Sequence, residues 1–152
     1  MTPPVEKTVT VPLPPKDAFR VFTEDMGTWW PLDSHSLSAG DGKTARDVTV
    51  DPKEGGKITE TRHDGTTADW ATITDWRPGE HLAFNWYVGR DPSEFTTVAV
   101  SFQTVEGGTR VDLRHDGFDN LPDGATVATG YRTGWDGVFC TRFGGACQKR
   151  AA

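Results

Sequence analysis

Residues 81–115 read HLAFNWYVGRDPSEFTTVAVSFQTVEGGTRVDLRH and contain three runs in which apolar and polar side chains alternate. This two-residue period is typical of β-strands that bury one face of a sheet. The links between the runs contain Gly or Pro and are shorter than the roughly one dozen residues that a parallel crossover needs. The stretch therefore predicts neighbouring antiparallel strands with Phe84, Trp86 and His115 on the inner face.

Similar runs extend the predicted sheet toward the N-terminus. The expected strands cover residues 5–11, 47–50, 57–63, 69–76, 81–88, 95–105 and 109–116. Pro15 can occupy the first turn of a short helix that buries Ala18, Phe19 and Phe22, and one more helical turn fits within residues 25–30. We expect seven strands, mainly a meander, and two short N-terminal helices.

The apolar period changes to about 3.6 residues from residue 124 to residue 150, which predicts one long C-terminal helix. Its expected inner face carries Val127, Tyr131, Trp135, Val138 and Arg142. Gly130, Gly134 and Gly137 suggest that the helix approaches the sheet closely or leaves room for another group. The sequence thus predicts an α+β fold in which a curved sheet packs on a helix, and incomplete filling would leave a cavity.

Size and charge narrow the class of protein. A chain of 152 residues with 35% hydrophobic residues fits one domain, residues 1–152, with a core of its own. The net charge of −6 argues against nucleic acid as a partner. No stretch reads as a membrane span or secretory signal, so we expect a soluble cytoplasmic protein.

The two cysteines are expected to be free thiols. Cys140 and Cys147 lie seven residues apart in the predicted helix. The helical rise separates them by roughly 10.5 Å, beyond the approximately 7 Å limit on the Cα separation of a disulfide. This pair suggests a reducing compartment.

Signatures of metal, cofactor and nucleophile sites are not visible in the sequence. The four histidines are isolated, and neither cysteine has a histidine at ligand spacing. The Gly-Gly pairs at 55–56 and 107–108 read as hairpin glycines rather than phosphate loops. We therefore expect no metal and no cofactor.

A set of aromatic and polar residues remains as the candidate ligand site. The expected ligand-binding residues are Trp30, Glu60, Arg62, Phe84, Trp86, His115, Tyr131 and Trp135. Glu60 and Arg62 share the inner parity of one strand, where they form an ion pair at the rim or line the cavity. His115 is either a hydrogen-bonded histidine at a strand end or an acid or base, and Tyr131 either packs in the core or lines the cavity.

The segment 34–44 is expected to be a mobile loop at the entrance of the cavity. It contains Gly40, Gly42 and three serines, and it has few large apolar side chains. Such a segment buries little surface to offset the entropy of ordering its backbone. We expect a bound ligand to order it, with His35 and Leu37 reaching toward the pocket.

Several fragments spread over nearly the whole chain carry a family resemblance. They are Ala18-Phe19 with Phe22-Thr23, Trp29-Trp30-Pro31, Gly55-Gly56 followed by Glu60, Asp64-Gly65, Trp76 with Pro78, Leu82 with Phe84 and Trp86, Gly108-Thr109-Arg110-Val111 with Leu113 and His115, and Tyr131 with Gly134-Trp135. In order and spacing the chain resembles the activator-of-heat-shock-protein-ATPase-like (AHSA-type) branch of the START-related, helix-grip (SRPBCC) superfamily. This resemblance implies a seven-stranded antiparallel sheet that grips a C-terminal helix around a hydrophobic ligand cavity.

Three functions fit these observations. The leading hypothesis is a non-catalytic small-molecule binding protein whose ligand is apolar or aromatic with one polar or anionic group. The alternative is an enzyme of the polyketide cyclase, aromatase or hydrolase type that uses a pocket His or Glu as general base. A chaperone-interaction module ranks third, because the predicted outer face of the sheet carries charges of mixed sign.

Overall fold

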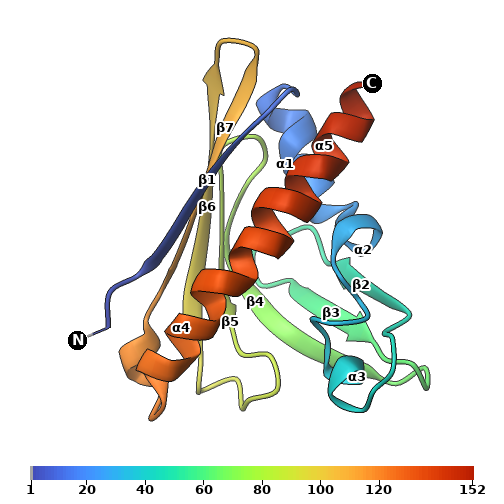
Figure 1. Ribbon diagram of the computed structural model, residues 1–152, viewed down its shortest axis with the longest axis vertical. Helices are drawn as coiled ribbons and strands as arrows, with labels where there is room; N and C mark the ends of the chain where they lie inside the picture. The colour runs from blue at the N-terminus through green and yellow to red at the C-terminus, as the bar shows by residue number, and fades with distance from the viewer. Residues whose placement is uncertain (1) are drawn as a thin grey trace.

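The computed structural model describes residues 2–152 and contains one curved antiparallel sheet (Figure 1). The strands are β1 (Val5–Val11), β2 (Asp47–Val50), β3 (Lys57–Thr61), β4 (Thr67–Arg77), β5 (His81–Trp86), β6 (Thr96–Val105) and β7 (Gly108–Asp116). Their order across the sheet is β1-β7-β6-β5-β4-β3-β2. The predicted meander of seven strands is confirmed, with β1 paired beside β7.

The helices lie at the ends and on one face of this sheet. They are α1 (Pro15–Thr23), α2 (Met26–Trp29), α3 (Leu37–Gly40), the 3-10 turn η1 (Phe118–Asn120), α4 (Gly124–Trp135), the π-helical segment η2 (Asp136–Phe143) and α5 (Gly144–Ala151). Figure 1 shows α4, η2 and α5 as one long helix that crosses the sheet diagonally and ends beside α1. This arrangement is the α+β helix-grip fold that the sequence predicts.

Helix α1 closes one end of the core. Pro15 occupies its first turn, where a missing N–H costs no hydrogen bond. Phe19 is buried, and its ring contacts those of Trp76 and Phe102 at centroid distances of 5.0 and 5.2 Å. The apolar face of α1, which the sequence predicts, thus packs against β4 and β6.

Strand β4 contains an irregularity that the alternating pattern does not reveal. Ile58 pairs with Ala71, but the next residue of β3, Thr59, pairs with Asp69. Trp70 is therefore the extra residue of a β-bulge, and both Trp70 and its neighbour Ala71 are buried. A regular strand would point these two side chains to opposite faces, so the bulge directs Trp70 into the core.

The C-terminal helix differs from the prediction in its second half. Its backbone widens into a π-helix over Asp136–Phe143, which changes the angle between successive side chains. As a result Phe139, Phe143 and Cys147 are buried, whereas Arg142, which we expected on the inner face, is exposed. The assignment of Arg142 to the inner face is wrong for this reason.

Gly130, Gly134 and Gly137 of this helix do not mark a close approach to the sheet. A Cβ atom added to Gly130 or Gly137 would meet no atom within 4 Å, and one added to Gly134 would meet only His35 Nε2, at 3.9 Å. These positions face solvent or the segment after α2. The interpretation that they allow close sheet packing is wrong.

No helix within residues 2–152 is long and apolar enough to cross a membrane. Both cysteines are free in the structure, as their spacing predicts.

Candidate functional site

Four indole rings from four separate segments meet under the N-terminal half of the C-terminal helix. Trp30 follows α2, Trp70 lies on β4, Trp86 on β5 and Trp135 at the end of α4. Trp30 contacts the other three rings at centroid distances of 5.2, 5.9 and 6.0 Å, and all four residues are buried. We call these four residues the tryptophan cluster. Sequence reasoning identified three of them and missed Trp70, because only the bulge turns it inward.

Each indole N–H of the tryptophan cluster has an acceptor inside the protein. A buried N–H without an acceptor would lose its hydration without compensation, so these bonds stabilise one arrangement of the rings. The bonds are Trp30 Nε1 to the His35 carbonyl (2.7 Å), Trp70 Nε1 to Glu60 Oε1 (3.0 Å), Trp86 Nε1 to Tyr131 Oη (2.7 Å) and Trp135 Nε1 to His115 Nδ1 (3.0 Å). The cluster is therefore linked directly to three of the predicted polar residues.

Glu60 is a fully buried carboxylate that anchors α3 to the sheet. Its oxygens accept hydrogen bonds from Leu37 N (2.7 Å), Ser38 N (3.1 Å) and Ser38 Oγ (2.9 Å), in addition to Trp70 Nε1. Such charge-assisted bonds compensate for the burial of the charge. Ser38, which sequence reasoning did not single out, is itself fully buried.

Arg62 does not form the ion pair with Glu60 that the sequence suggests. Within residues 2–152, no hydrogen bond or ion pair involves the Arg62 side chain, and its Nε atom is buried without a partner. The carboxylate of Glu60 is instead occupied by α3 and Trp70. The interpretation of an ion pair at the rim is therefore wrong.

His115 lies at the end of β7 and uses both ring nitrogens. Trp135 Nε1 donates to Nδ1, so the proton of the neutral ring is on Nε2, which donates to Thr96 Oγ1 at 2.7 Å. Burial lowers the pKa of His115 to about 3, although the nearby Asp116 carboxylate opposes this change. His115 is thus a hydrogen-bonded neutral histidine at a strand end, one of the two interpretations that the sequence left open.

Tyr131 of α4 is partly buried and lies against Trp86. Its hydroxyl accepts from Trp86, and no residue from 2 to 152 accepts the hydroxyl proton of Tyr131 in return. Burial raises the pKa of Tyr131, so the phenol keeps this proton at neutral pH. Beside it lies a hollow of about 10 Å³ that is bordered by Trp86, Arg90 and Val127. A space of this size holds approximately one water molecule.

The structure joins seven of the eight predicted site residues into one connected set. Phe84 is fully buried and contacts Trp86 at a centroid distance of 5.7 Å, and His115 contacts Tyr131 at 4.5 Å. Within residues 2–152, no hydrogen bond joins the Arg62 side chain to this set. Among residues 2–152, no group of three His, Cys, Asp or Glu side chains is placed to hold a metal ion.

The segment 34–44 contains α3 and lies beside the tryptophan cluster, where the His35 carbonyl accepts the indole N–H of Trp30. It is more structured than a Ser/Gly-rich loop suggests: Ser36 caps α3 by accepting a hydrogen bond from Ala39 N at 3.1 Å. Together with the bonds to Glu60, this cap fixes the position of α3 over the sheet. The mobility of the segment stays a prediction.

Comparisons with known proteins agree with this architecture. The family model described as "Activator of Hsp90 ATPase homolog 1-like protein" matches residues 12–145. Among solved structures, protein MLL2253 from Mesorhizobium loti is 19% identical, with 98% of each chain covered and a TM-score of 0.66. Protein NE0264 from Nitrosomonas europaea is 14% identical, with 97% of this chain and 95% of that chain covered and a TM-score of 0.68.

A third structure is similar in sequence as well as in fold. An anthrahydroquino-γ-pyrone synthase, Txn09, in complex with SUM, is 28% identical, with 95% of this chain and 96% of that chain covered and a TM-score of 0.65. The comparison with curated proteins gave no match. The family match covers most of the chain and agrees with the helix-grip sheet and helix. The chain therefore belongs to the family of Activator of Hsp90 ATPase homolog 1-like proteins, a branch of the START-related superfamily.

Proposed function

We propose that this protein binds a planar aromatic molecule with a carbonyl or phenolic oxygen, beside Trp86 and Tyr131. The observation that carries this proposal is the Tyr131 hydroxyl, which accepts one hydrogen bond and offers its own proton to no residue from 2 to 152. A ligand oxygen in the adjacent hollow would accept that proton. The raised pKa of Tyr131 keeps the hydroxyl a donor at neutral pH.

Arg90 supplies a second donor for the same oxygen. It borders the hollow, and its Nη2 atom is bonded to Asp123 at 3.2 Å. No other guanidinium N–H of Arg90 has an acceptor within residues 2–152. An oxygen between Tyr131 and Arg90 would therefore receive one neutral and one charge-assisted hydrogen bond.

The apolar part of the ligand would lie against aromatic and aliphatic side chains. The hollow is bordered by Trp86, Leu121 and Val127 as well as by the two donors. Its present volume admits approximately a water molecule, so binding requires Tyr131 to turn or residues 87–95 to move outward. Gly89, at a φ of 71°, gives this connection a residue that tolerates unusual backbone angles.

A fluorescence titration tests the proposal. We expect planar phenols and hydroxyquinones to quench tryptophan emission, because they would bind against Trp86. Tyr131→Phe should weaken binding about fivefold to tenfold, the effect of one lost hydrogen bond. Arg90→Met should weaken it by a similar factor, whereas Arg132→Met, at an exposed arginine on the same helix as Tyr131, should leave affinity unchanged. Equal affinities for all four proteins would contradict the proposed site.

An enzymatic function is the second candidate, because the 28% identical neighbour is described as a synthase. Tyr131 and Arg90 could polarise a ligand carbonyl in such a reaction. His115 and Glu60, the residues expected to act as general base, are less suited to that role. Both nitrogens of His115 and both oxygens of Glu60 already have hydrogen-bond partners. Binding therefore ranks first. To test the enzymatic function, a phenolic β-diketone can be incubated with the protein and the products identified by mass spectrometry. A cyclised, dehydrated product that is absent with Tyr131→Phe would rank the enzymatic function first.

A further inference from the structure

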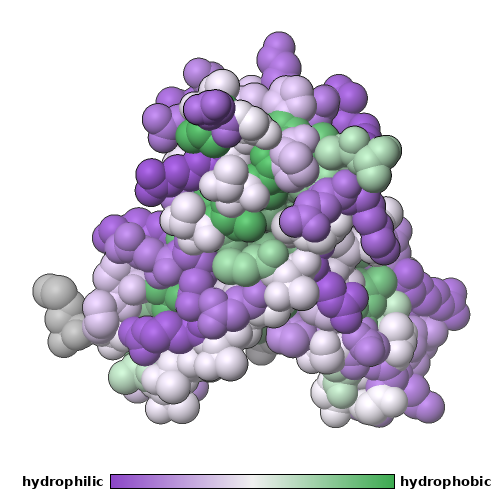
Figure 2. All heavy atoms as spheres, turned by 45° about the horizontal axis from the view of Figure 1, so that its top comes forward, coloured by the Kyte–Doolittle hydropathy of each residue, from purple (hydrophilic) through white to green (hydrophobic). Residues whose placement is uncertain are grey.

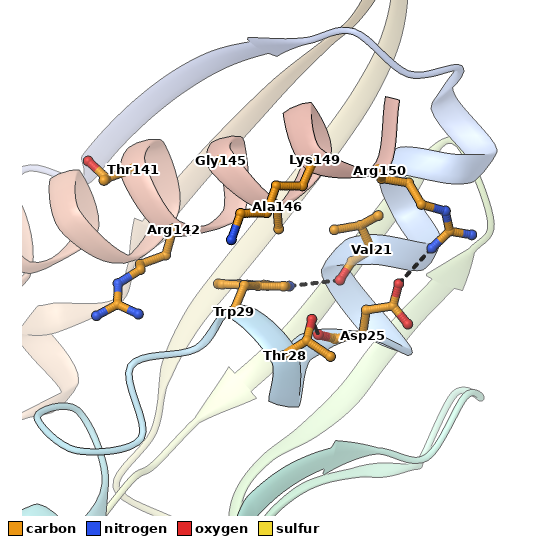
Figure 3. A pocket seen from close by; sticks show the side chains of 10 residues that line it. All are labelled: Val21, Asp25, Thr28, Trp29, Thr141, Arg142, Gly145, Ala146, Lys149 and Arg150. Atoms are coloured by element: carbon orange, nitrogen blue, oxygen red, sulfur yellow. Dashed lines mark hydrogen bonds and ion pairs between the residues drawn. The ribbon is translucent and has the colours of Figure 1, made fainter. Parts of the chain in front are cut away.

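A groove of about 580 Å³ opens between the N-terminal helices α1 and α2 and the C-terminal half of the long helix, η2 and α5. Figure 3 shows its lining: Val21 and Asp25 come from α1 and the turn after it, and Trp29 comes from α2. Thr141 and Arg142 of η2 and Lys149 of α5 line the opposite wall. None of the residues that line this groove lines the proposed site beside Trp86, and no pattern in the sequence predicts the groove.

The floor of the groove is apolar. Trp29 is buried and donates its indole N–H to the Val21 carbonyl at 2.7 Å, so the small exposed part of its ring offers the groove no hydrogen-bond donor. Ala146 and Gly145 complete the lining on the side of α5. Figure 2, in which the top of Figure 1 comes forward, shows apolar residues exposed among hydrophilic ones at this end of the molecule. The floor can therefore hold the apolar body of a small molecule.

Most polar groups around the groove already have partners in the protein. Thr28 Oγ1 donates to the Asp25 carbonyl at 2.6 Å, and the Asp25 carboxylate pairs with Arg150 at 2.9 Å. Arg142 and Lys149 are two exceptions among these polar groups. Both are exposed, and neither forms an ion pair or a side-chain hydrogen bond within residues 2–152. On a protein of net charge −6, these two unpaired cations beside an apolar floor favour an anion.

We propose that this groove binds a free amphiphilic carboxylate, with the acyl chain over Trp29 and the carboxylate between Arg142 and Lys149. Its volume lies within the range of roughly 300–1,000 Å³ that is typical of small-molecule sites. Figure 3 shows Lys149 and Ala146 above the Trp29 ring, with Arg142 descending from the same helix beside that ring. A concave groove with two cations fits a single carboxylate better than it fits an extended anionic membrane surface.

The π-helical segment contributes to this groove directly. It shifts the phase of the helix so that Arg142 points outward, although simple 3.6-residue spacing would place it inward with Tyr131 and Trp135. Directly after η2, a Cβ atom added to Gly145 would meet nothing within 4 Å. A larger side chain at Gly145 would therefore occupy the groove without displacing the backbone.

Titration calorimetry with monomeric dodecanoate tests this inference. We expect one molecule to bind per chain, and dodecanol, which lacks the charge, to bind at least about tenfold more weakly. Arg142→Glu and Lys149→Glu should each weaken dodecanoate binding by about tenfold, because each converts an attraction to a repulsion. Gly145→Leu should weaken binding, because its side chain would occupy part of the groove.

Two matched variants serve as controls. Arg132→Glu makes the same charge change on α4, and Gly130→Leu makes the same enlargement at another glycine with open space around it. Both should bind dodecanoate like the unmodified protein, and amide NMR spectra should show that all variants are folded. The indole N–H signal of Trp29, assigned with Trp29→Phe, should shift on binding.

Three results would overturn the inference: no dodecanoate binding up to millimolar concentration, binding that Gly145→Leu leaves unchanged, or equal losses in the test and control variants. Binding that is abolished by Tyr131→Phe and unchanged by Arg142→Glu would place the carboxylate beside Trp86 instead. The two proposed sites can therefore fail independently.

Discussion

Replacement of Glu60 by Ala should lower the free energy of unfolding by about 3–5 kcal/mol and detach α3 from the sheet. The substitution removes the acceptor of four hydrogen bonds, from Leu37 N, Ser38 N, Ser38 Oγ and Trp70 Nε1. The Trp70 indole would stay buried without an acceptor. Urea denaturation followed by circular dichroism measures the loss, and hydrogen exchange should show that the amides of Leu37 and Ser38 lose protection first.

Two variants separate this effect from a general loss of a carboxylate. Glu54→Ala removes an exposed carboxylate from the link between β2 and β3, and we expect a change within about 0.5 kcal/mol. Glu60→Gln keeps one acceptor oxygen, so its stability should lie between those of the unmodified protein and Glu60→Ala. A Glu60→Ala protein within about 1 kcal/mol of the unmodified protein would show that α3 is not held by this carboxylate.

Glu60 also decides how the predicted entrance segment behaves. If residues 34–44 open to admit a ligand, they must first release the bonds of Leu37 and Ser38 to this buried carboxylate. Each bond to a charged group contributes roughly 1.5–3 kcal/mol. Strong protection of these amides in the free protein would contradict a mobile entrance there and would favour residues 87–95 as the path to Trp86.

The strands and their faces could be predicted because the signal is local. In β5 and β7 the two-residue period places Phe84, Trp86 and His115 on one side, and these residues are buried as predicted. A one-residue error in register would expose every one of them, so burial itself fixes the alternation. The same reasoning brought Trp86, Tyr131 and Trp135 into one site.

The parts that could not be predicted depend on backbone irregularities. The bulge in β4 shifts the strand pattern by one residue and turns Trp70 inward. The π-helix shifts the helical pattern by a fraction of a turn and turns Arg142 outward. Neither leaves a characteristic residue type in the sequence. The partners of Glu60 were missed for another reason: two of its four donors are backbone N–H groups of α3, and backbone donors carry no sequence signal.

Stability should fall as the pH is lowered from 7.5 to 5, by about 2 kcal/mol from His115 alone. Burial lowers the pKa of this histidine from 6.5 to about 3 in the folded protein, with Asp116 opposing the change. Between these two values the unfolded chain binds a proton that the folded protein does not. Protonation therefore favours unfolding, and the contribution of His115 is complete above pH 6.5 and is lost progressively toward pH 3.

The structure explains why the folded protein resists this proton. Nδ1 of His115 accepts from Trp135 Nε1, so a proton on that nitrogen would face another N–H donor and break the bond to the tryptophan cluster. His115→Gln should therefore be less stable at pH 7.5, yet it should lose less stability on acidification to pH 5, so that the gap between the two proteins narrows. His35→Gln, at an exposed histidine, should keep the full pH dependence. Denaturation curves at pH 7.5, 6.5 and 5 for the three proteins measure these slopes, and parallel slopes for all three would contradict a neutral, buried His115.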